Sequence, residues 1–156
     1  MLRLAVATVV APVMLASCGA FDGPRTSSLP VETIRIDTAS GSKAFTVEVA
    51  ADAASQQRGL MYRRDLPPDA GMLFDFHQNV LATFWMKDTP LPLDMVFIKS
   101  DGTVASIAQN AVPYSTHTIP SPEPVRAVLE INGGRAHDLG IRPGDKVRAP
   151  IFDDVE

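Results

Sequence analysis

The segment from Phe84 to Asp94 carries the most chemically varied side chains of the chain. It contains the only tryptophan, Trp85, together with Lys87 and two aspartates. An apolar aromatic wall with a few charged groups at its mouth is the usual construction of a small-molecule site. We therefore expect a ligand site with Trp85 as its wall and Lys87 and Asp94 at its rim. The alternatives are that Trp85 fills the core and that Lys87 pairs with Asp94.

Three further charged residues belong to the candidate ligand-binding set. Arg58 and Arg63 bracket a Gly-Leu-Met segment, and a guanidinium fork suits a carboxylate or phosphate. Glu130 lies between Leu129 and Ile131 in an alternating segment. We expect Glu130 to be exposed or paired with one of these arginines, and an Arg58–Glu130 salt bridge is the purely structural alternative.

No residue spacing in the chain dictates a reaction. Ser115, Thr116 and His117 are candidate groups for hydrolysis together with Asp94, but they carry no nucleophile-elbow pattern. Asp94 and Glu130 could serve as a glycosidase pair only at a separation that a sequence does not reveal. We therefore expect an envelope domain that binds a small polar or sugar-like ligand, such as a glycan, rather than an enzyme. A non-catalytic scaffold or assembly partner and a hydrolase of envelope polymers remain as alternatives.

Thioether and imidazole side chains raise the alternative of copper handling. Soft thioether ligands favour copper(I). Outside the N-terminal segment, the candidate ligands are Met61, Met72, Met86, Met95, His77 and His117. Because no two of them are closely spaced and methionine is a common filler of irregular cores, we expect no metal and no cofactor.

The N-terminal residues are typical of an exported protein. Arg3 precedes an apolar run from Leu4 to Leu15 of about twelve residues, short of the roughly twenty that span a bilayer. The junction that ends in Cys18 resembles the bacterial lipobox. We therefore expect a signal peptide at 1–17, lipidation of Cys18 and a place on the periplasmic face of the outer membrane. A soluble periplasmic protein is the alternative.

Cysteine content and charge narrow the classes further. Cys18 is the only cysteine, so no internal disulfide can form. The net charge is −4, and no basic run is present, which is unlike a nucleic-acid-binding protein. The 156 residues suffice for one domain with a core. We expect a tether at 18–30, a single domain at 31–150 and a tail at 151–156, with the oligomeric state open.

Alternating apolar and polar residues predict short strands through most of this domain. They fall at 34–36, 45–49, 72–76, 82–86, 95–98, 104–107, 125–131 and around 147. Asp101-Gly102 is a strong hairpin signal, and short helices are predicted at 52–57 and 135–139. The prolines of 112–124 indicate a long loop. The predicted fold is mostly β, a compact antiparallel β-sandwich or barrel of seven to eight short strands with two short helices.

Several short motifs occur in an order that resembles one known family. They are Arg58–Met61, Gly71–Phe74, Phe84–Thr89, Pro92–Asp94, Leu129-Glu130, Leu139–Ile141 and Gly144-Asp145. The chain resembles the bacterial and archaeal family called domain of unknown function 192, from about Phe45 to Val147, as a lipoprotein-type member. The resemblance implies one compact, mostly β domain, often exported, without an established activity. This chain has Asp88 where the family commonly has asparagine.

Overall fold

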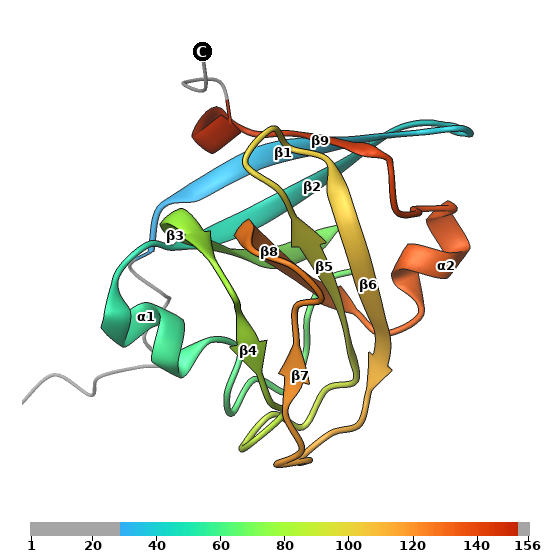
Figure 1. Ribbon diagram of the computed structural model, residues 1–156. Coiled ribbons are helices and arrows are strands. Elements are labelled where there is room, and N and C mark those ends of the chain that lie inside the picture. Colours follow the sequence, from blue (N-terminus) through green and yellow to red (C-terminus); the bar gives the residue numbers. More distant parts are fainter. Residues whose placement is uncertain (1–28, 153–156) are drawn as a thin grey trace, which may run out of the picture.

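The computed structural model describes residues 29–152, and these fold mainly into β-strands (Figure 1). Seven strands form one sheet: β1 (Val31–Thr38), β2 (Gly41–Ala50), β3 (Ala70–Val80), β5 (Leu93–Ile98), β6 (Val104–Ala111), β8 (Val125–Asn132) and β9 (Lys146–Arg148). Two short strands, β4 (Thr83–Phe84) and β7 (Ile119–Pro120), pair with each other. The helices are α1 (Ala53–Arg58), α2 (Arg135–Leu139) and the 3₁₀ helix η1 (Pro150–Phe152). The prediction of a mostly β fold with two short helices is confirmed.

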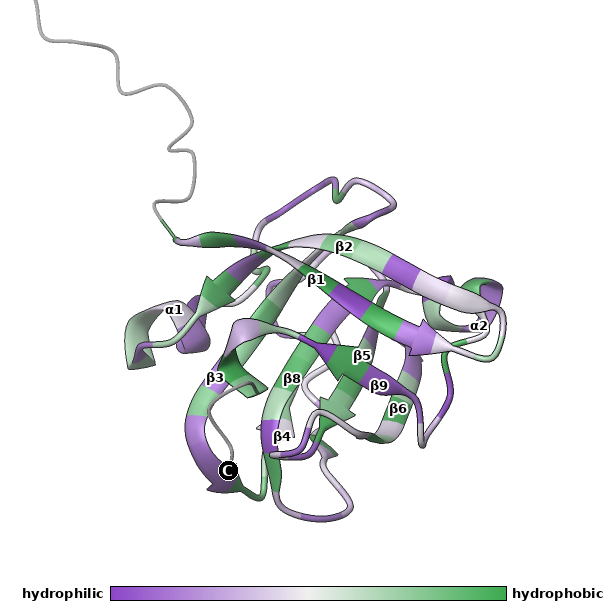
Figure 2. Cartoon of the chain, turned by 90° about the horizontal axis from the view of Figure 1, so that it is seen from above, coloured by the Kyte–Doolittle hydropathy of each residue, from purple (hydrophilic) through white to green (hydrophobic). Residues whose placement is uncertain are grey.

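The large sheet curls into a half-barrel. Its strand order is β6-β5-β8-β3-β2-β1-β9, and the β2-β1-β9 end crosses over the other strands (Figures 1 and 2). The two edge strands approach each other at one end, where Thr103 forms a β-bridge with Lys146. Backbone hydrogen bonds beside this bridge join Val104 to Asp145 at 2.9 Å and Val147 to Gly102 at 2.8 Å. The sheet therefore has a concave inner face and a convex outer face.

One strand pair departs from the predicted antiparallel arrangement. β2 and β3 are parallel, whereas every other pair in the sheet is antiparallel. Parallel neighbours cannot be joined by a tight turn, because the chain must return to the end of the sheet where the first strand began. Residues 51–69, called the crossover below, make this return and contain α1. Alternation within each strand does not reveal the relative direction of two strands, which is why the sequence missed this pair.

Local sequence signals explain where α1 begins and ends. The Asp52 carboxylate accepts the N–H groups of Ala54 and Ser55 at 2.9 and 3.0 Å, which satisfies donors that a helix start leaves open. Gly59 ends the helix with φ +48°. Its missing side chain also matters, because a Cβ there would lie 3.2 Å from the ring of Phe74. The crossover helix thus starts and stops where the sequence predicts.

Apolar side chains pack on both faces of the central strands. The inner core contains residues from all seven strands and includes Leu73, Val96 and Leu129. The outer core includes Met72, Met95 and Val128, which alternate with those inner residues along the same strands. Leu60, from the crossover, covers this outer layer. Met86 is also buried in the outer core, so three of the four methionines considered for copper fill the core.

Two boundaries differ from the predicted ones. The strand expected at 82–86 is limited to Thr83 and Phe84, because its partner β7 is only two residues long. The 112–124 loop contains this partner. Phe152, from the predicted tail, is 9% exposed and packs in the inner core. Within 29–152 no helix has the length and apolar character needed to cross a membrane. The predicted signal peptide, most of the tether and Cys18 lie outside the described residues.

Gly71 allows β3 and β8 to lie close together. A Cβ at Gly71 would lie 2.5 Å from the carbonyl oxygen of Glu130, a backbone atom that cannot move independently. We predict that Gly71→Ala lowers the free energy of unfolding by about 1–3 kcal/mol, because the two strands must separate locally. Denaturant unfolding of both proteins measures the difference. Equal stability of variant and parent would show that this close approach is not required.

Candidate functional site

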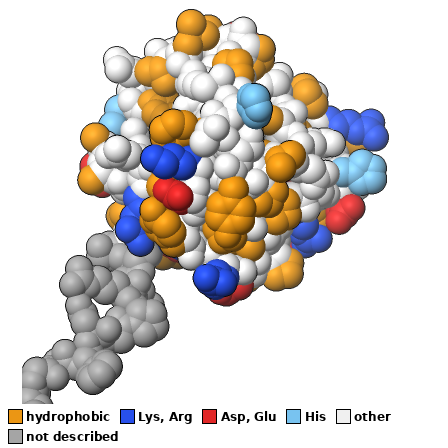
Figure 3. All heavy atoms as spheres, turned by 90° about the horizontal axis from the view of Figure 1, so that it is seen from below, with side chains coloured by type: hydrophobic (Ala, Val, Ile, Leu, Met, Phe, Trp, Pro, Cys, Tyr) orange, Lys and Arg blue, Asp and Glu red, His pale blue; other side chains and the backbone are white. Residues whose placement is uncertain are grey.

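A cavity of about 290 Å³ opens on the outer face of the sheet. The crossover, β3, the segment around β4 and one residue of β8 surround it. The lining residues are Gln56, Gln57, Arg58, Gly59, Leu60, Met61, Phe74, Phe76, Ala82, Thr83, Phe84, Trp85, Thr89 and Glu130. In Figure 3 apolar side chains form patches on the lower face of the molecule, with basic side chains between them. The sequence-predicted residues Arg58, Trp85 and Glu130 therefore share one cavity.

Aromatic rings form much of the cavity wall. Phe84 is at the centre of these contacts, with ring centroids 5.0 Å from Phe74 and 6.4 Å from Phe76, both in edge-to-face geometry. Trp85 follows Phe84 and is 46% exposed, so it does not fill the core. The indole lies at the mouth of the cavity, where it can contact both a ligand and water.

Glu130 is the one acidic residue that lines the cavity. It lies on β8 between Met72 of β3 and Met95 of β5, its partners across the two adjacent strands. Glu130 is only 4% exposed. Within the described residues its carboxyl group has no hydrogen-bond or ion-pair partner, so neither the expected exposure nor the expected pairing with Arg58 or Arg63 occurs.

Burial without a partner changes the ionisation of this carboxyl group. Moving a carboxylate out of water penalises its charged form, and no nearby cation or donor offsets that penalty. Burial accordingly raises the pKa of Glu130 from 4.5 to about 8. At neutral pH the group is therefore mainly the neutral acid, which can both donate and accept a hydrogen bond.

Asp94 has a different role from the one predicted. It is fully buried, and it does not line the cavity. Its carboxylate accepts backbone N–H groups of Asn110 at 2.8 Å, Gly134 at 3.0 Å and Ala136 at 2.8 Å. Gly134 precedes α2 and has no side chain to cap it, so Asp94 satisfies the open donors at that helix start. The carboxylate joins β5 to β6 and to α2.

Lys87 and the two arginines are also separated by the fold. The Lys87 ammonium lies 5.5 Å from the ring centroid of Trp85, in a cation–π contact, and is not paired with Asp94. Arg58 lines the cavity, with its guanidinium carbon 6.0 Å from the Tyr62 ring centroid. Arg63 instead forms a bidentate ion pair with Glu48 of β2, with N···O distances of 2.5 and 2.6 Å. Arg58 and Lys87 are therefore the cations near the mouth, and Arg63 is structural.

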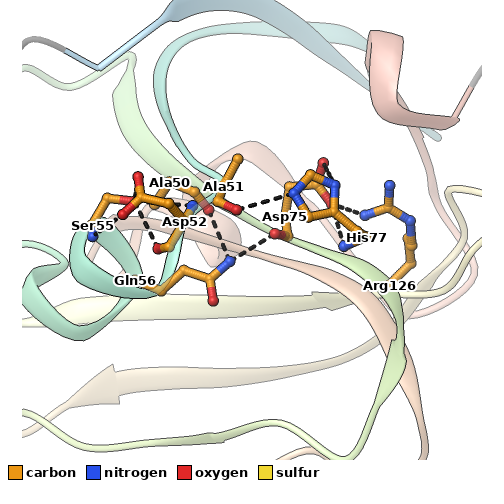
Figure 4. A network of polar contacts seen from close by, with 8 residues as sticks. All are labelled: Ala50, Ala51, Asp52, Ser55, Gln56, Asp75, His77 and Arg126. Atoms are coloured by element: carbon orange, nitrogen blue, oxygen red, sulfur yellow. Dashed lines mark hydrogen bonds and ion pairs between the residues drawn. The ribbon is translucent and has the colours of Figure 1, made fainter.

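A polar network that sequence reasoning missed anchors α1 beside the cavity (Figure 4). Gln56 of α1 donates to the carbonyl oxygens of Ala50 at 3.2 Å and Asp75 at 2.7 Å. The buried Asp75 carboxylate forms an ion pair with Arg126 and accepts the backbone N–H of His77 at 2.7 Å. Burial lowers the pKa of Arg126 from its usual value. Sequence offered no signal for this network, because its main contacts join three segments that are distant along the chain: 50–56, 75–77 and Arg126.

The described residues 29–152 contain no group of three or more His, Cys, Asp and Glu side chains arranged to hold a metal ion. The polar groups on the lining side chains are one carboxyl group, one guanidinium, two amides, two hydroxyls and one indole N–H. This set suits hydrogen bonding to a polar organic ligand with an apolar body.

Glu130→Gln is predicted to change how stability depends on pH. The proton on folded Glu130 is released on unfolding wherever the pH lies between its unfolded pKa, near 4.5, and its folded pKa of about 8. The free energy of unfolding should therefore fall as pH rises through this window and level off above about 8. The variant lacks this slope, so its stability relative to the parent should increase with pH, up to a few kcal/mol. If denaturant unfolding shows the same change of stability with pH for the variant and the parent, the raised pKa of Glu130 is contradicted.

Asp94→Ala tests the structural role of Asp94. The change leaves three backbone N–H groups without an acceptor, one of them, that of Ala136, buried, which should cost about 3 kcal/mol in unfolding free energy. Asp94→Asn keeps one acceptor oxygen and should cost less. Thermal and denaturant unfolding of both variants measure the order. An alanine variant as stable as the parent would show that these bonds are dispensable.

Comparisons with known proteins agree with the resemblance noted in the sequence. Residues 34–149 match the family domain of unknown function 192 (DUF192), described as "Uncharacterized ACR". No curated protein matches the chain. A crystal structure from Sinorhizobium meliloti 1021, of a protein proposed to be a transcription regulator, has 50% identity and a TM-score of 0.77, covering 80% of this chain and 97% of that one.

A second crystal structure, of a protein of unknown function from Novosphingobium aromaticivorans DSM 12444, is 42% identical. Its TM-score is 0.78, and the match covers 86% of this chain and 94% of that one. The matched range 34–149 contains all the residues that line the cavity, from Gln56 to Glu130. The chain belongs to the DUF192 family.

Proposed function

We propose that this protein binds a small sugar-like ligand in the cavity above Glu130. The observation that carries the proposal is a buried carboxyl group without a partner that lines an aromatic cavity open to solvent. Burying a polar group without a hydrogen bond costs stability. A ligand hydroxyl that reaches Glu130 would supply the missing bond, so the site is complete only when it is occupied.

The other lining groups suit the same class of ligand. Trp85 and Phe76 present apolar ring surface for one face of a sugar, and Trp85 is accessible at the mouth. Arg58 and Gln57 offer donors at the rim. A cavity of about 290 Å³ is near the lower end of the range for organic ligands, which favours a single ring inside it.

Two of the alternatives receive less support from the geometry. A hydrolase would need Glu130 to lie in one cleft with Asp94 or His117, and neither of these lines the cavity. A scaffold without a ligand would not require a cavity beside Trp85. The transcription-regulator description belongs to the Sinorhizobium protein, and the net charge of −4 here does not favour contact with phosphates.

Export and anchoring complete the proposal. We infer that the chain is cleaved before Cys18, lipidated there and held at the periplasmic face of the outer membrane, because Leu15–Cys18 resembles a lipobox and Gly19 rather than an acidic residue follows.

Binding can be followed through Trp85, since no other tryptophan contributes to indole fluorescence. We predict a saturable change with at least one of glucose, galactose, mannose and N-acetylglucosamine. Glu130→Ala should weaken that binding about tenfold or more, equivalent to about 1.4 kcal/mol. Glu123→Gln, at a residue that does not line the cavity, is the matched control and should bind normally. No saturable response to any of the four sugars would reject the proposal.

Labelling with a fatty-acid analogue tests the anchor. Cells that produce the full chain should yield a labelled mature protein, and Cys18→Ser should abolish the label because the thiol that accepts the lipid is gone. A mature protein without label would favour the soluble periplasmic alternative.

A further inference from the structure

We propose a second carbohydrate subsite beside the cavity, formed by Tyr62, Arg64, Asp88, Pro90 and Tyr114, so that the ligand is an oligosaccharide of at least two rings. These residues line a hollow of about 110 Å³. Tyr62 is 63% exposed and Tyr114 is 64% exposed, which is unusual for large aromatic residues. The inference rests on the proposed binding of a sugar in the first cavity.

The two hollows lie on opposite sides of one short segment. Thr89 lines the first cavity, whereas its neighbours Asp88 and Pro90 line the second hollow. Arg58 lines the first cavity and contacts the ring of Tyr62, which lines the second, at 6.0 Å. The first cavity and the second hollow are therefore adjacent at Arg58 and at Thr89.

The backbone of the second hollow is held in an unfavourable conformation. Of the five non-glycine residues with positive φ in the described chain, three line this hollow: Tyr62 at 66°, Asp88 at 56° and Tyr114 at 61°. Residues other than glycine rarely adopt this region, because the Cβ crowds the backbone. Such outliers gather at ligand sites, where the surrounding structure enforces them.

The hydrogen bonds that hold Tyr62 and Tyr114 in these conformations are made with Asp88 and Thr89. The Tyr62 N–H donates to the carbonyl oxygen of Asp88 at 2.7 Å, and the Tyr62 hydroxyl donates to the Asp88 carboxylate at 3.0 Å. The Tyr114 N–H donates to the carbonyl oxygen of Thr89 at 3.1 Å. The fold thus fixes both tyrosines in exposed positions next to Thr89, which also lines the first cavity.

The side chains indicate the chemistry of the second ring. Two accessible aromatic faces can stack on a sugar ring, and Arg64 and Asp88 can donate to and accept from its hydroxyls. Charges of both signs lie within one small hollow, which disfavours a strongly anionic or cationic polymer. A neutral glycan fits this combination.

The test compares N-acetylglucosamine with its β-1,4-linked tetramer, using Trp85 fluorescence and calorimetry. The parent should bind the tetramer at least tenfold more tightly than the monomer. Tyr114→Ala should lower tetramer affinity about tenfold and leave monomer affinity unchanged. Arg64→Ala, at an exposed side chain, should also lower tetramer affinity, and it serves as the test variant if Tyr114→Ala fails to fold. Val112→Ala, at an exposed residue of the same loop outside the hollow, is the control.

The possible failures are distinguishable. If the monomer binds and the tetramer binds no more tightly, or if Tyr114→Ala and Arg64→Ala leave tetramer affinity unchanged, the second subsite is wrong and the proposed function stands. If neither sugar binds and the monosaccharide panel also gives no response, both proposals are overturned together.

Discussion

The parallel pairing of β2 with β3 determines how the outer face of the sheet is covered. Because the two strands run in the same direction, residues 51–69 must return along the sheet, and they do so over its outer face. That return places Leu60 on the outer core and makes α1 and the Gly59–Met61 segment one wall of the cavity. An all-antiparallel sheet joined by tight turns would leave this face uncovered, and the cavity would not exist.

Covering the outer face determines the environment of Glu130. On an uncovered sheet this side chain would lie in water, opposite the inner-facing Leu129 and Ile131. Here it lies between Met72 and Met95 beneath aromatic rings, and burial favours its neutral form. Gly71 allows β3 to lie close to the backbone of Glu130, so this glycine and the buried carboxyl group belong to one local arrangement. An unpartnered buried polar group costs stability, and the proposed ligand would supply the hydrogen bond that Glu130 lacks.

Local patterns predicted much of the fold. The β1–β2 hairpin, the Asp101-Gly102 turn, the Asp52 cap of α1 and the Gly140 stop of α2 each depend on residues within a few positions of one another. The parallel pairing of β2 with β3, the three N–H groups around Asp94 and the contacts of Asp75 with Gln56 and Arg126 join residues 16 to 51 positions apart, which periodicity does not report. Arg58, Trp85 and Glu130 were selected by residue type, and they share the cavity. Asp94 and Arg63 were selected in the same way, but the fold gives both a structural partner.

The ionisation of Glu130 decides whether the proposed site exists, because the buried carboxyl group is what the proposed ligand recognises. It can be measured by an NMR pH titration that follows the side-chain carboxyl carbon of Glu130 in the ligand-free protein. A buried carboxyl group without a partner should give a midpoint displaced far above 4.5, near about 8. A midpoint at the ordinary value would show that the carboxyl group is solvated or paired, and it would contradict the proposed site.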